Sequence, residues 1–181
     1  DTFRQVLTLA EELDIPIHTH LHETAFEVSD AAAKTGQRPL ARLDELGLIS
    51  PRLIAAHGVH LTPAEIQRLA QCNACIAHNP SSNLKLASGI ATVADLLAAG
   101  VTVGLGSDGA ASNNRQDIFT EMRLAALLAK AQSQEADALP AWQALEMATV
   151  HGARALGWDS LTGSLENGKQ ADLIAVEMDD L

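Results

Sequence analysis

The amino-acid sequence predicts an α/β protein in which helices connect the strands of a parallel sheet. Short apolar segments alternate along the chain with helical segments and loops, which is the order of strand–helix–strand units. These short segments are apolar throughout, so both faces of each strand are expected to be buried. Polar residues follow them directly, which places candidate functional groups at one edge of the sheet.

The predicted strands occupy residues 15–20, 53–57, 74–78 and 101–106. The predicted helices occupy residues 2–13, about 24 to a break at Gly36, 39–46, 62 onward, 92–99, 116–132, 141–149 and a short stretch near 153. The helix at Thr62 opens with a capping residue, then a proline and an acid, which together favour a helix start. A loop is expected at residues 79–83.

Composition narrows the class of protein. With 181 residues, 47% of them hydrophobic, the chain is long enough for one domain with a core. Aromatic residues make up only 3%, so aliphatic side chains must fill that core. The net charge of −11 would repel a phosphate backbone, which argues against nucleic-acid binding. No apolar run reaches the length of a membrane span and no signal-peptide pattern opens the chain, so we expect no membrane association and a cytoplasmic location.

Titratable side chains stand at or just after the carboxyl end of every predicted strand: His20, His57, His78 and Asp108. In barrels and open parallel sheets, binding and catalytic sites form at this edge. A single histidine in such a position is more often a satisfied core residue. Polar strand ends in every strand in succession favour a functional site instead.

Residues 18–23, His-Thr-His-Leu-His-Glu, hold the densest group of candidate ligands. Because alternate residues of a strand share a face, His18, His20 and His22 would point to one side if the strand continued that far. Imidazoles and carboxylates are the usual ligands of catalytic zinc or iron. Glu23 lies close enough to His20 to move protons at such a site, or it is an acid at the start of the next helix, and both roles can coexist.

Three local patterns also have other interpretations. Asp108 could bind a metal and accept a proton from water, but Asp-Gly is also a common turn signal. Residues 104–109 match the dinucleotide-binding pattern Gly-x-Gly-x-x-Gly, but Asp108 would put a negative charge against the pyrophosphate and the next helix begins only near residue 116. Cys72 and Cys75 form a single Cys-x-x-Cys, which is more typical of two buried thiols than of a redox or zinc site.

Four segments at the predicted strand ends appear in a characteristic order: HLHET at 20–24, AHGVH at 56–60, HNPSSNLKL at 78–86 and GSDGAASNN at 106–114. Together they resemble the methylthioadenosine/S-adenosylhomocysteine deaminases and their chlorohydrolase relatives in the amidohydrolase superfamily. The ending GSLENGKQADL at 163–173 is similar to the return of that family into a small β-sandwich domain. The resemblance covers nearly the whole chain.

The resemblance implies a domain organisation. Residues 1–160 would form the second half of a (β/α)8 metal-dependent hydrolase barrel, strands five to eight with their helices. Residues 161–181 would lead, with a terminal strand at 171–176, into the small β-sandwich domain. The family's His-x-His ligand pair on strand one would lie in a half that this chain does not include. We therefore expect these residues to be part of a longer protein, and to be poorly stable and inactive alone.

The resemblance also implies roles for individual residues. His20 and Asp108 would bind one divalent metal ion, for which zinc is preferred and iron or manganese are alternatives. Glu23, His57 and Asp108 would carry the catalysis: Glu23 as a proton shuttle, His57 as the group that stabilises the attacked centre, and Asp108 as the acceptor of a proton from water. These three would also bind substrate, together with His78 and Ser112.

The reaction implied by the resemblance is the hydrolytic deamination of an adenosine-type purine nucleoside to an inosine-type product and ammonia. A triazine chlorohydrolase or a guanine or cytosine deaminase of the same superfamily is an alternative. A non-catalytic α/β binding module is a second alternative, although it would have no need of the polar strand ends. The resemblance also allows a homo-oligomer, but no segment of the sequence indicates an interface.

Overall fold

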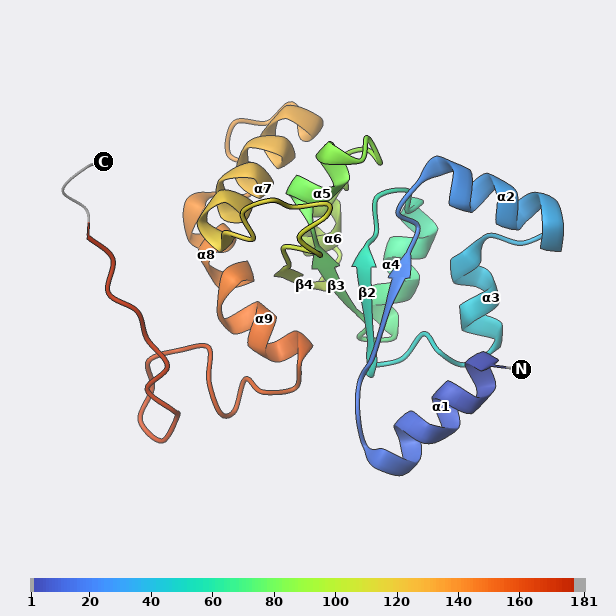
Figure 1. The fold of residues 1–181 in the computed structure, drawn as a ribbon, viewed down its shortest axis with the longest axis horizontal. Coiled ribbons are helices and arrows are strands. Elements are labelled where there is room, and N and C mark those ends of the chain that lie inside the picture. Colours follow the sequence, from blue (N-terminus) through green and yellow to red (C-terminus); the bar gives the residue numbers. More distant parts are fainter. Residues whose placement is uncertain (1, 178–181) are drawn as a thin grey trace.

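The computed structural model describes residues 2–177, and it confirms the predicted parallel sheet (Figure 1). Strands β1 (Ile17–Leu21), β2 (Leu53–His57), β3 (Cys75–His78) and β4 (Thr102–Leu105) lie side by side in chain order, and every neighbouring pair is parallel. The carboxyl ends of the strands therefore meet at one edge of the sheet, to which the arrowheads of Figure 1 point.

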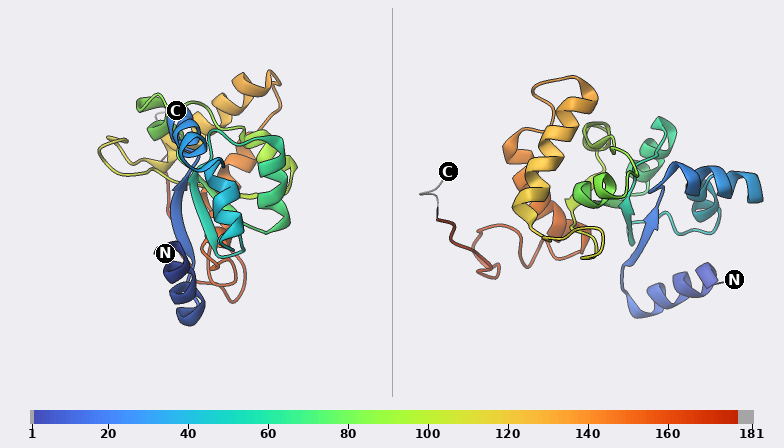
Figure 2. Two further views of the ribbon diagram at one scale, coloured as in Figure 1. Left: turned by 90° about the vertical axis from the view of Figure 1, so that its right-hand side faces the viewer. Right: turned by 45° about the horizontal axis from the view of Figure 1, so that its top comes forward.

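Helices make all the connections between the strands. Helix α1 (Thr2–Leu13) precedes β1, and the remaining helices follow in chain order: α2 (Ala25–Thr35) and α3 (Pro39–Glu45) before β2, α4 (Pro63–Gln71) before β3, α5 (Pro80–Lys85) and α6 (Val93–Ala98) before β4, and then α7 (Ile118–Ser133), α8 (Ala141–Ala148) and α9 (Val150–Ala155). The chain after α9 leaves the helical layer and runs along the outside of the molecule (Figures 1 and 2). No helix within residues 2–177 combines the length and the apolar character needed to cross a membrane.

Local sequence explains where two of these helices begin. The hydroxyl of Thr24 accepts a hydrogen bond from the backbone amide of Glu27 at 3.1 Å and so caps α2. Thr62 and Glu65 form the complete capping box of α4, in which each side chain accepts from the other residue's amide. The helix start predicted at Thr62 is therefore confirmed.

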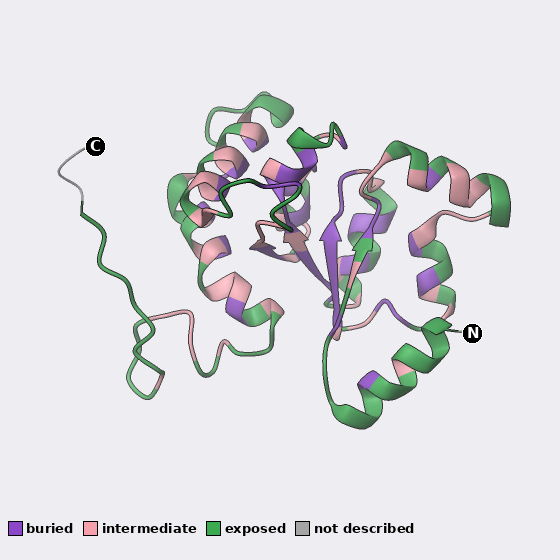
Figure 3. Cartoon of the chain, viewed as in Figure 1, coloured by how far each residue is buried: buried purple, intermediate pink, exposed green. Residues whose placement is uncertain are grey.

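The two faces of the sheet differ. Leu21, Leu53, Ile76 and Val103 pack with helix residues such as Leu96 into one apolar cluster, which is the core. The alternate residues point to the opposite face, where His18 and His20 of β1 are exposed. Figure 3 shows this contrast between the buried strand β2 and the exposed positions of β1.

Small residues cross this second face in one row. The strand register pairs His20 with Ala56, Ala56 with Ala77, and Ala77 with Gly104. Helix α9 packs directly onto the far end of the row, where a Cβ atom on Gly104 would lie 3.1 Å from the Cα atom of Gly152. The row of small side chains therefore leaves room for α9 at one end and an open surface beside His20 at the other.

Two expectations about local structure are wrong. A loop is expected at residues 79–83, but α5 begins there, because Pro80 takes the first helical position, where its missing N–H costs nothing. A strand is expected at 171–176, but within the described residues this is an exposed extended segment. No described strand lies beside it, and an unpaired strand has no ladder to stabilise it.

Candidate active site

Three of the predicted site residues converge at the carboxyl edge of the sheet. One ligand atom each of His20, His57 and Asp108 can be chosen so that all three lie within 4.8 Å of one another. The rings of His20 and His57 stack with their centroids 5.3 Å apart and their planes 17° apart. The strand register pairs His57 with Leu21 and not with His20. His57 ends β2 with a left-handed backbone, with φ of 76°, and its ring lies beside that of His20. Two imidazoles and a carboxylate are a suitable donor set for a divalent cation.

Asp108 is held in one orientation by three donors. Its Oδ2 atom accepts from the hydroxyls of Ser82 at 2.6 Å and Ser112 at 2.8 Å, and its Oδ1 atom accepts from the amide of Gly109 at 2.8 Å. The hydrogen bond from Ser82 is the main reason that the pKa of Asp108 falls from 3.8 to about 2. The backbone of Asp108 is left-handed, with φ of 57°, so the turn that aims this side chain is itself unusual for a residue with a Cβ.

His57 is oriented by an amide. Its Nδ1 atom lies 2.8 Å from Oδ1 of Asn83, and both residues are buried. Because an amide oxygen only accepts hydrogen bonds, Nδ1 carries the ring proton and Nε2 presents its lone pair. That Nε2 atom lies 3.8 Å from Oε2 of Glu23.

Glu23 reaches the site from the loop after β1. Its amide donates to the carboxylate of Glu27 at 2.7 Å, and its Oε1 atom accepts from the hydroxyl of Ser88 at 3.4 Å. The suggestion that Glu23 is the acid of the following helix is wrong, because Thr24 is the cap and Glu27 is the acid in the first turn of α2. The side chain of Glu23 is thus available for a role beside His57.

His22 does not share a face with His20. Strand β1 ends at Leu21, and the left-handed backbone of His22, with φ of 54°, turns its ring into the protein. There the ring is fully buried, and its Nε2 atom accepts from the amide of Leu40 at 3.1 Å. Burial lowers the pKa of His22. The hypothesis that three alternate histidines point to one side therefore fails at the third.

A second cluster surrounds His22 and supports the same loop. Arg38 pairs with Glu65 at 2.7 Å and donates to the backbone oxygen of His60 at 2.6 Å. Burial raises the pKa of Glu65, but hydrogen bonds from Arg38 and from the Thr62 amide outweigh it, and the net pKa is lowered. This ion pair joins the start of α3 to the first turn of α4, next to the buried ring of His22.

His78 and Ser112, predicted to contact substrate, lie close to the site in different ways. Ser112 bonds to Asp108, as described above. His78 is 2% exposed, and its Nδ1 atom has no hydrogen-bond partner among the described residues. Burial, with a smaller contribution from His57, lowers the pKa of His78 to about 4, so its ring is neutral near pH 7. Contact with a substrate stays a prediction for both residues.

A cavity of about 330 Å³ opens beside the converging side chains, on the exposed face of the sheet. Its walls come from β1, β2 and β3 and from the segments that follow β3 and β4, and they comprise His18, Thr19, His20, Ala56, Ala77, Asn79, Gly106, Ser107 and Asp108. A Cβ atom on Gly106 would overlap Oδ1 of Asn79, so a larger residue there would require the Asn79 side chain to move. This close packing, together with that of Gly104 on α9, accounts for the first two glycines of the pattern at 104–109 without a dinucleotide.

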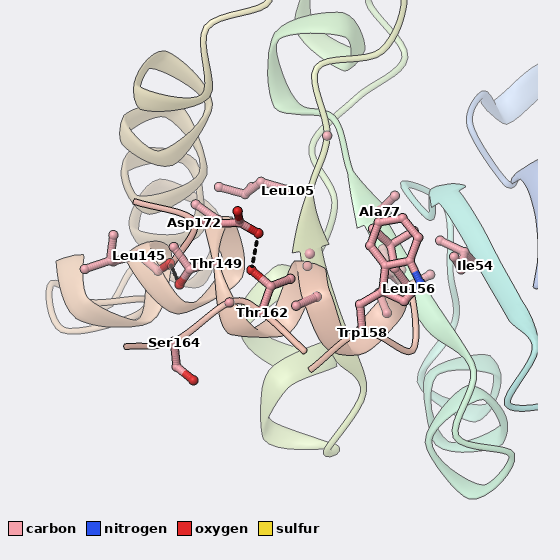
Figure 4. Close-up of a pocket in the computed structure, with 18 of the residues that line it drawn as sticks. Ile54, Ala77, Leu105, Leu145, Thr149, Leu156, Trp158, Thr162, Ser164 and Asp172 are labelled. Atoms are coloured by element: carbon pink, nitrogen blue, oxygen red, sulfur yellow. Dashed lines mark hydrogen bonds between the residues drawn. The ribbon is translucent and has the colours of Figure 1, made fainter. Parts of the chain in front are cut away.

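A larger cavity of about 870 Å³ lies further along the same face, between the sheet, α8, α9 and the carboxyl-terminal segment (Figure 4). Its walls are mostly apolar, with Ile54, Leu156 and Trp158 among them. A hydrogen bond of 2.9 Å from Thr162 to Asp172 crosses its rim. The titratable groups converge at the smaller cavity, so we assign the candidate active site there despite its size.

Several supporting residues are not singled out by the sequence. Ser82 and Asn83 lie within the segment that carries the resemblance, but nothing in the sequence says which strand-end group each would touch. Glu121 and Asn113 are buried and hydrogen-bonded to each other at 2.7 Å. The sequence does contain one indication that Glu121 is unusual, because this acid lies on the apolar side of a predicted helix.

Cys72 and Cys75 are free thiols, in agreement with the simpler interpretation of that pair.

A parallel sheet with titratable groups gathered at its carboxyl edge is the architecture of enzymes built on α/β barrels and open α/β sheets. The chain belongs to the amidohydrolase family, whose profile matches residues 1–181. It is 51% identical over 174 residues to a 5-methylthioadenosine/S-adenosylhomocysteine deaminase of Moorella thermoacetica, covering 96% of this chain and 41% of that protein. It is 47% identical to a 5'-deoxyadenosine deaminase of Methanothermobacter thermautotrophicus, covering 96% of this chain and 40% of that protein. The chain thus spans about two fifths of the length of these relatives.

Solved structures share the fold. An adenosine deaminase from Xanthomonas campestris with bound zinc superposes with a TM-score of 0.93 at 54% identity, covering 94% of this chain and 39% of that one. Atrazine chlorohydrolase from Arthrobacter aurescens, complexed with zinc, superposes with a TM-score of 0.87 at 32% identity, covering 93% and 37%. Guanine deaminase of E. coli gives 0.84 at 30% identity, covering 93% and 39%. The predicted family and the predicted part-barrel α/β fold are both confirmed.

Proposed function

We propose that this chain forms part of a zinc-dependent hydrolytic deaminase that acts on adenosine-type nucleosides, with methylthioadenosine and S-adenosylhomocysteine as substrates. The observation that carries the proposal is the convergence of His20, His57 and Asp108 within 4.8 Å at the carboxyl edge of the sheet. The names of the relatives at about half identity supply the substrate class.

The donor set fits a divalent metal ion. His20 is exposed toward the cavity, and Asp108 is charged at neutral pH because its pKa is about 2. We propose these two as metal ligands, with His57 beside them, and zinc as the ion, since two of the similar structures contain zinc. When bound, such an ion would lower the pKa of water and so supply a hydroxide nucleophile near neutral pH.

The chain's own side chains have distinct tasks in this proposal. Asp108 accepts a proton from the nucleophilic water, and the hydroxyls of Ser82 and Ser112 keep its carboxylate aimed. Glu23 protonates the purine ring nitrogen next to the carbon that is attacked. His57, whose Nε2 atom lies 3.8 Å from Glu23, stabilises the attacked centre by hydrogen bonding, because the Nε2 lone pair can accept from the hydroxyl group added to that carbon. The amino group then takes the proton held by Asp108 and leaves as ammonia, the added hydroxyl group returns a proton to Glu23, and an inosine-type product remains.

The domain assignment and the location belong to the same proposal. Residues 1–160 would supply strands five to eight of the barrel, and residues 161–181 would lead into a small β-sandwich domain; positions 178–181 lie outside the described residues. The high structural similarity to 39% of the Xanthomonas enzyme supports the first assignment. The free thiols suit a reducing compartment, which supports a cytoplasmic location.

A full-length fusion tests the substrate class. This chain would replace the matching segment of the full-length Moorella relative, and ammonia release would be measured with methylthioadenosine, S-adenosylhomocysteine and adenosine. The Asp108→Asn variant serves as the control. Ammonia from the parent protein, lost in the variant, would support the proposal. A zinc-loaded protein that is inert on all three but acts on a triazine or on guanine would favour the chlorohydrolase or nucleobase-deaminase alternative.

A further inference from the structure

A buried carboxylate lies behind the candidate site. Glu121, in the first turn of α7, is 0% exposed. Its Oε2 atom accepts from the backbone amide of Ser81 at 3.0 Å, and its Oε1 atom accepts from Nδ2 of Asn113 at 2.7 Å. The other buried residues of α7, Ala125 and Ala129, are apolar and pack into the core.

The two partners of Glu121 belong to the two segments that orient the site. Ser81 lies in α5, directly before Ser82, which bonds Asp108, and Asn83, which bonds His57. Asn113 lies in the loop after β4. The Nδ2 atom of Asn113 also donates at 2.9 Å to the backbone oxygen of Ser107, the residue that precedes Asp108. One carboxylate therefore connects both sides of the site.

Packing alone does not explain an acid at this position. Moving a carboxylate out of water is costly, and the cost is offset only when good donors satisfy its oxygens. Hydrogen bonds to a charged group are shorter and stronger than neutral ones, so they fix geometry as well as contribute energy. Glu121 has such a donor on each oxygen, and the two donors come from different segments.

We propose that Glu121 is a positioning residue that holds α5 and the loop after β4 in register, so that His57 and Asp108 converge on one point. This inference rests on the proposed function of those two residues. Glu121 itself is fully buried and acts through Ser81 and Asn113, not through contact with substrate.

The test compares Glu121→Gln with the parent in the full-length fusion. Glutamine keeps the shape of the side chain but replaces one of its two acceptor oxygens by an NH2 group. That NH2 group cannot accept the hydrogen bond that the Ser81 amide or Asn113 donates to this position in the parent. We expect kcat to fall roughly 10- to 100-fold and the affinity for zinc, measured by competition with a chelator, to fall on a similar scale, while KM changes by less than about threefold. Glu135→Gln, an exposed acid just beyond α7, is the matched control and should equal the parent.

A structural role alone would give a different result. The melting temperature would fall, but kcat per zinc-loaded, folded molecule and the zinc affinity would stay as in the parent, and that outcome would overturn the proposal. If Glu121→Gln does not fold, Glu121→Asp is the second variant, because it keeps the carboxylate but shortens the side chain by one methylene. It should show an intermediate loss of kcat and of zinc affinity. If the parent fusion is inactive on the adenosine compounds, the proposed function fails, but the zinc affinities still decide whether Glu121 positions the site.

Discussion

Ser82 donates a hydrogen bond of 2.6 Å from its hydroxyl to Oδ2 of Asp108, and this contact joins α5 to the turn after β4. Ser82 is fully buried, so the bond is protected from competition with water. It is the largest of the influences that lower the pKa of Asp108 to about 2. A carboxylate with that pKa keeps its negative charge at neutral pH, which suits binding a cation.

Replacing Ser82 by alanine should move the pKa of Asp108 upward toward 3.8, which a carbon-13 titration of the metal-free protein would measure. Because the pKa is lower in the folded than in the unfolded protein, this group stabilises the fold above pH 3.8 and loses that effect as the pH falls toward about 2. The variant should therefore be less stable than the parent at neutral pH, and the difference should shrink in acid. Ser29→Ala, on the exposed side of α2, is the control. An unchanged pKa of Asp108 would contradict the assignment.

Replacing Asn83 tests whether it sets the proton position on His57. Leucine removes the acceptor that faces Nδ1, whereas aspartate keeps one. We expect Asn83→Leu to mix the two neutral tautomers of His57, seen by nitrogen-15 NMR, and to lower kcat roughly 10- to 100-fold. Asn83→Asp should keep the proton on Nδ1 and retain more activity. The same tautomer and rate in all three proteins would show that Asn83 has no such role.

The sheet and its functional edge could be predicted from the sequence because both depend on local patterns. A continuous apolar run such as 53–57 indicates a strand buried on both faces, and parallel connection places the ends of such strands together. His20, His57 and Asp108 could therefore be grouped from their positions in the sequence alone. The family resemblance added their proposed roles, which composition and spacing do not supply.

The features that the sequence did not predict depend on contacts between distant segments or on single backbone angles. His22 continues the alternation of β1 in sequence, but its left-handed backbone turns the ring inward, between the Leu40 amide and the Glu65 carboxylate. The segment 79–83 has the composition of a loop, and only the position of Pro80 at a helix start distinguishes the two. The positioning role proposed for Glu121 depends on its hydrogen bond with the amide of Ser81, a residue that is distant in sequence.

Gly104→Ala tests the close approach of α9 to the sheet. The added Cβ atom would lie 3.1 Å from the Cα atom of Gly152, a backbone atom that cannot move alone. Overpacking of this kind costs about 1–3 kcal/mol, which lowers the melting temperature by several degrees in a domain of this size. Gly109→Ala is the control, since its Cβ would meet nothing within 4 Å. Equal melting temperatures of the two variants would show that α9 is not packed as described.

Glu23→Gln separates proton transfer from metal binding. The carboxylate lies 3.8 Å from Nε2 of His57 and accepts from Ser88, while the amide of Glu23 is fixed by Glu27, so glutamine can occupy the same place without disturbing the loop. If Glu23 carries the proton, kcat should fall by about 10²- to 10⁴-fold, because glutamine cannot donate an acidic proton. Zinc content should stay at the parent level, since the proposed ligands are intact. Glu12→Gln, an exposed acid of α1, controls for the loss of one negative charge. Loss of zinc together with activity would make Glu23 a ligand, and a rate close to that of the Glu12 variant would assign the proton transfer to another group.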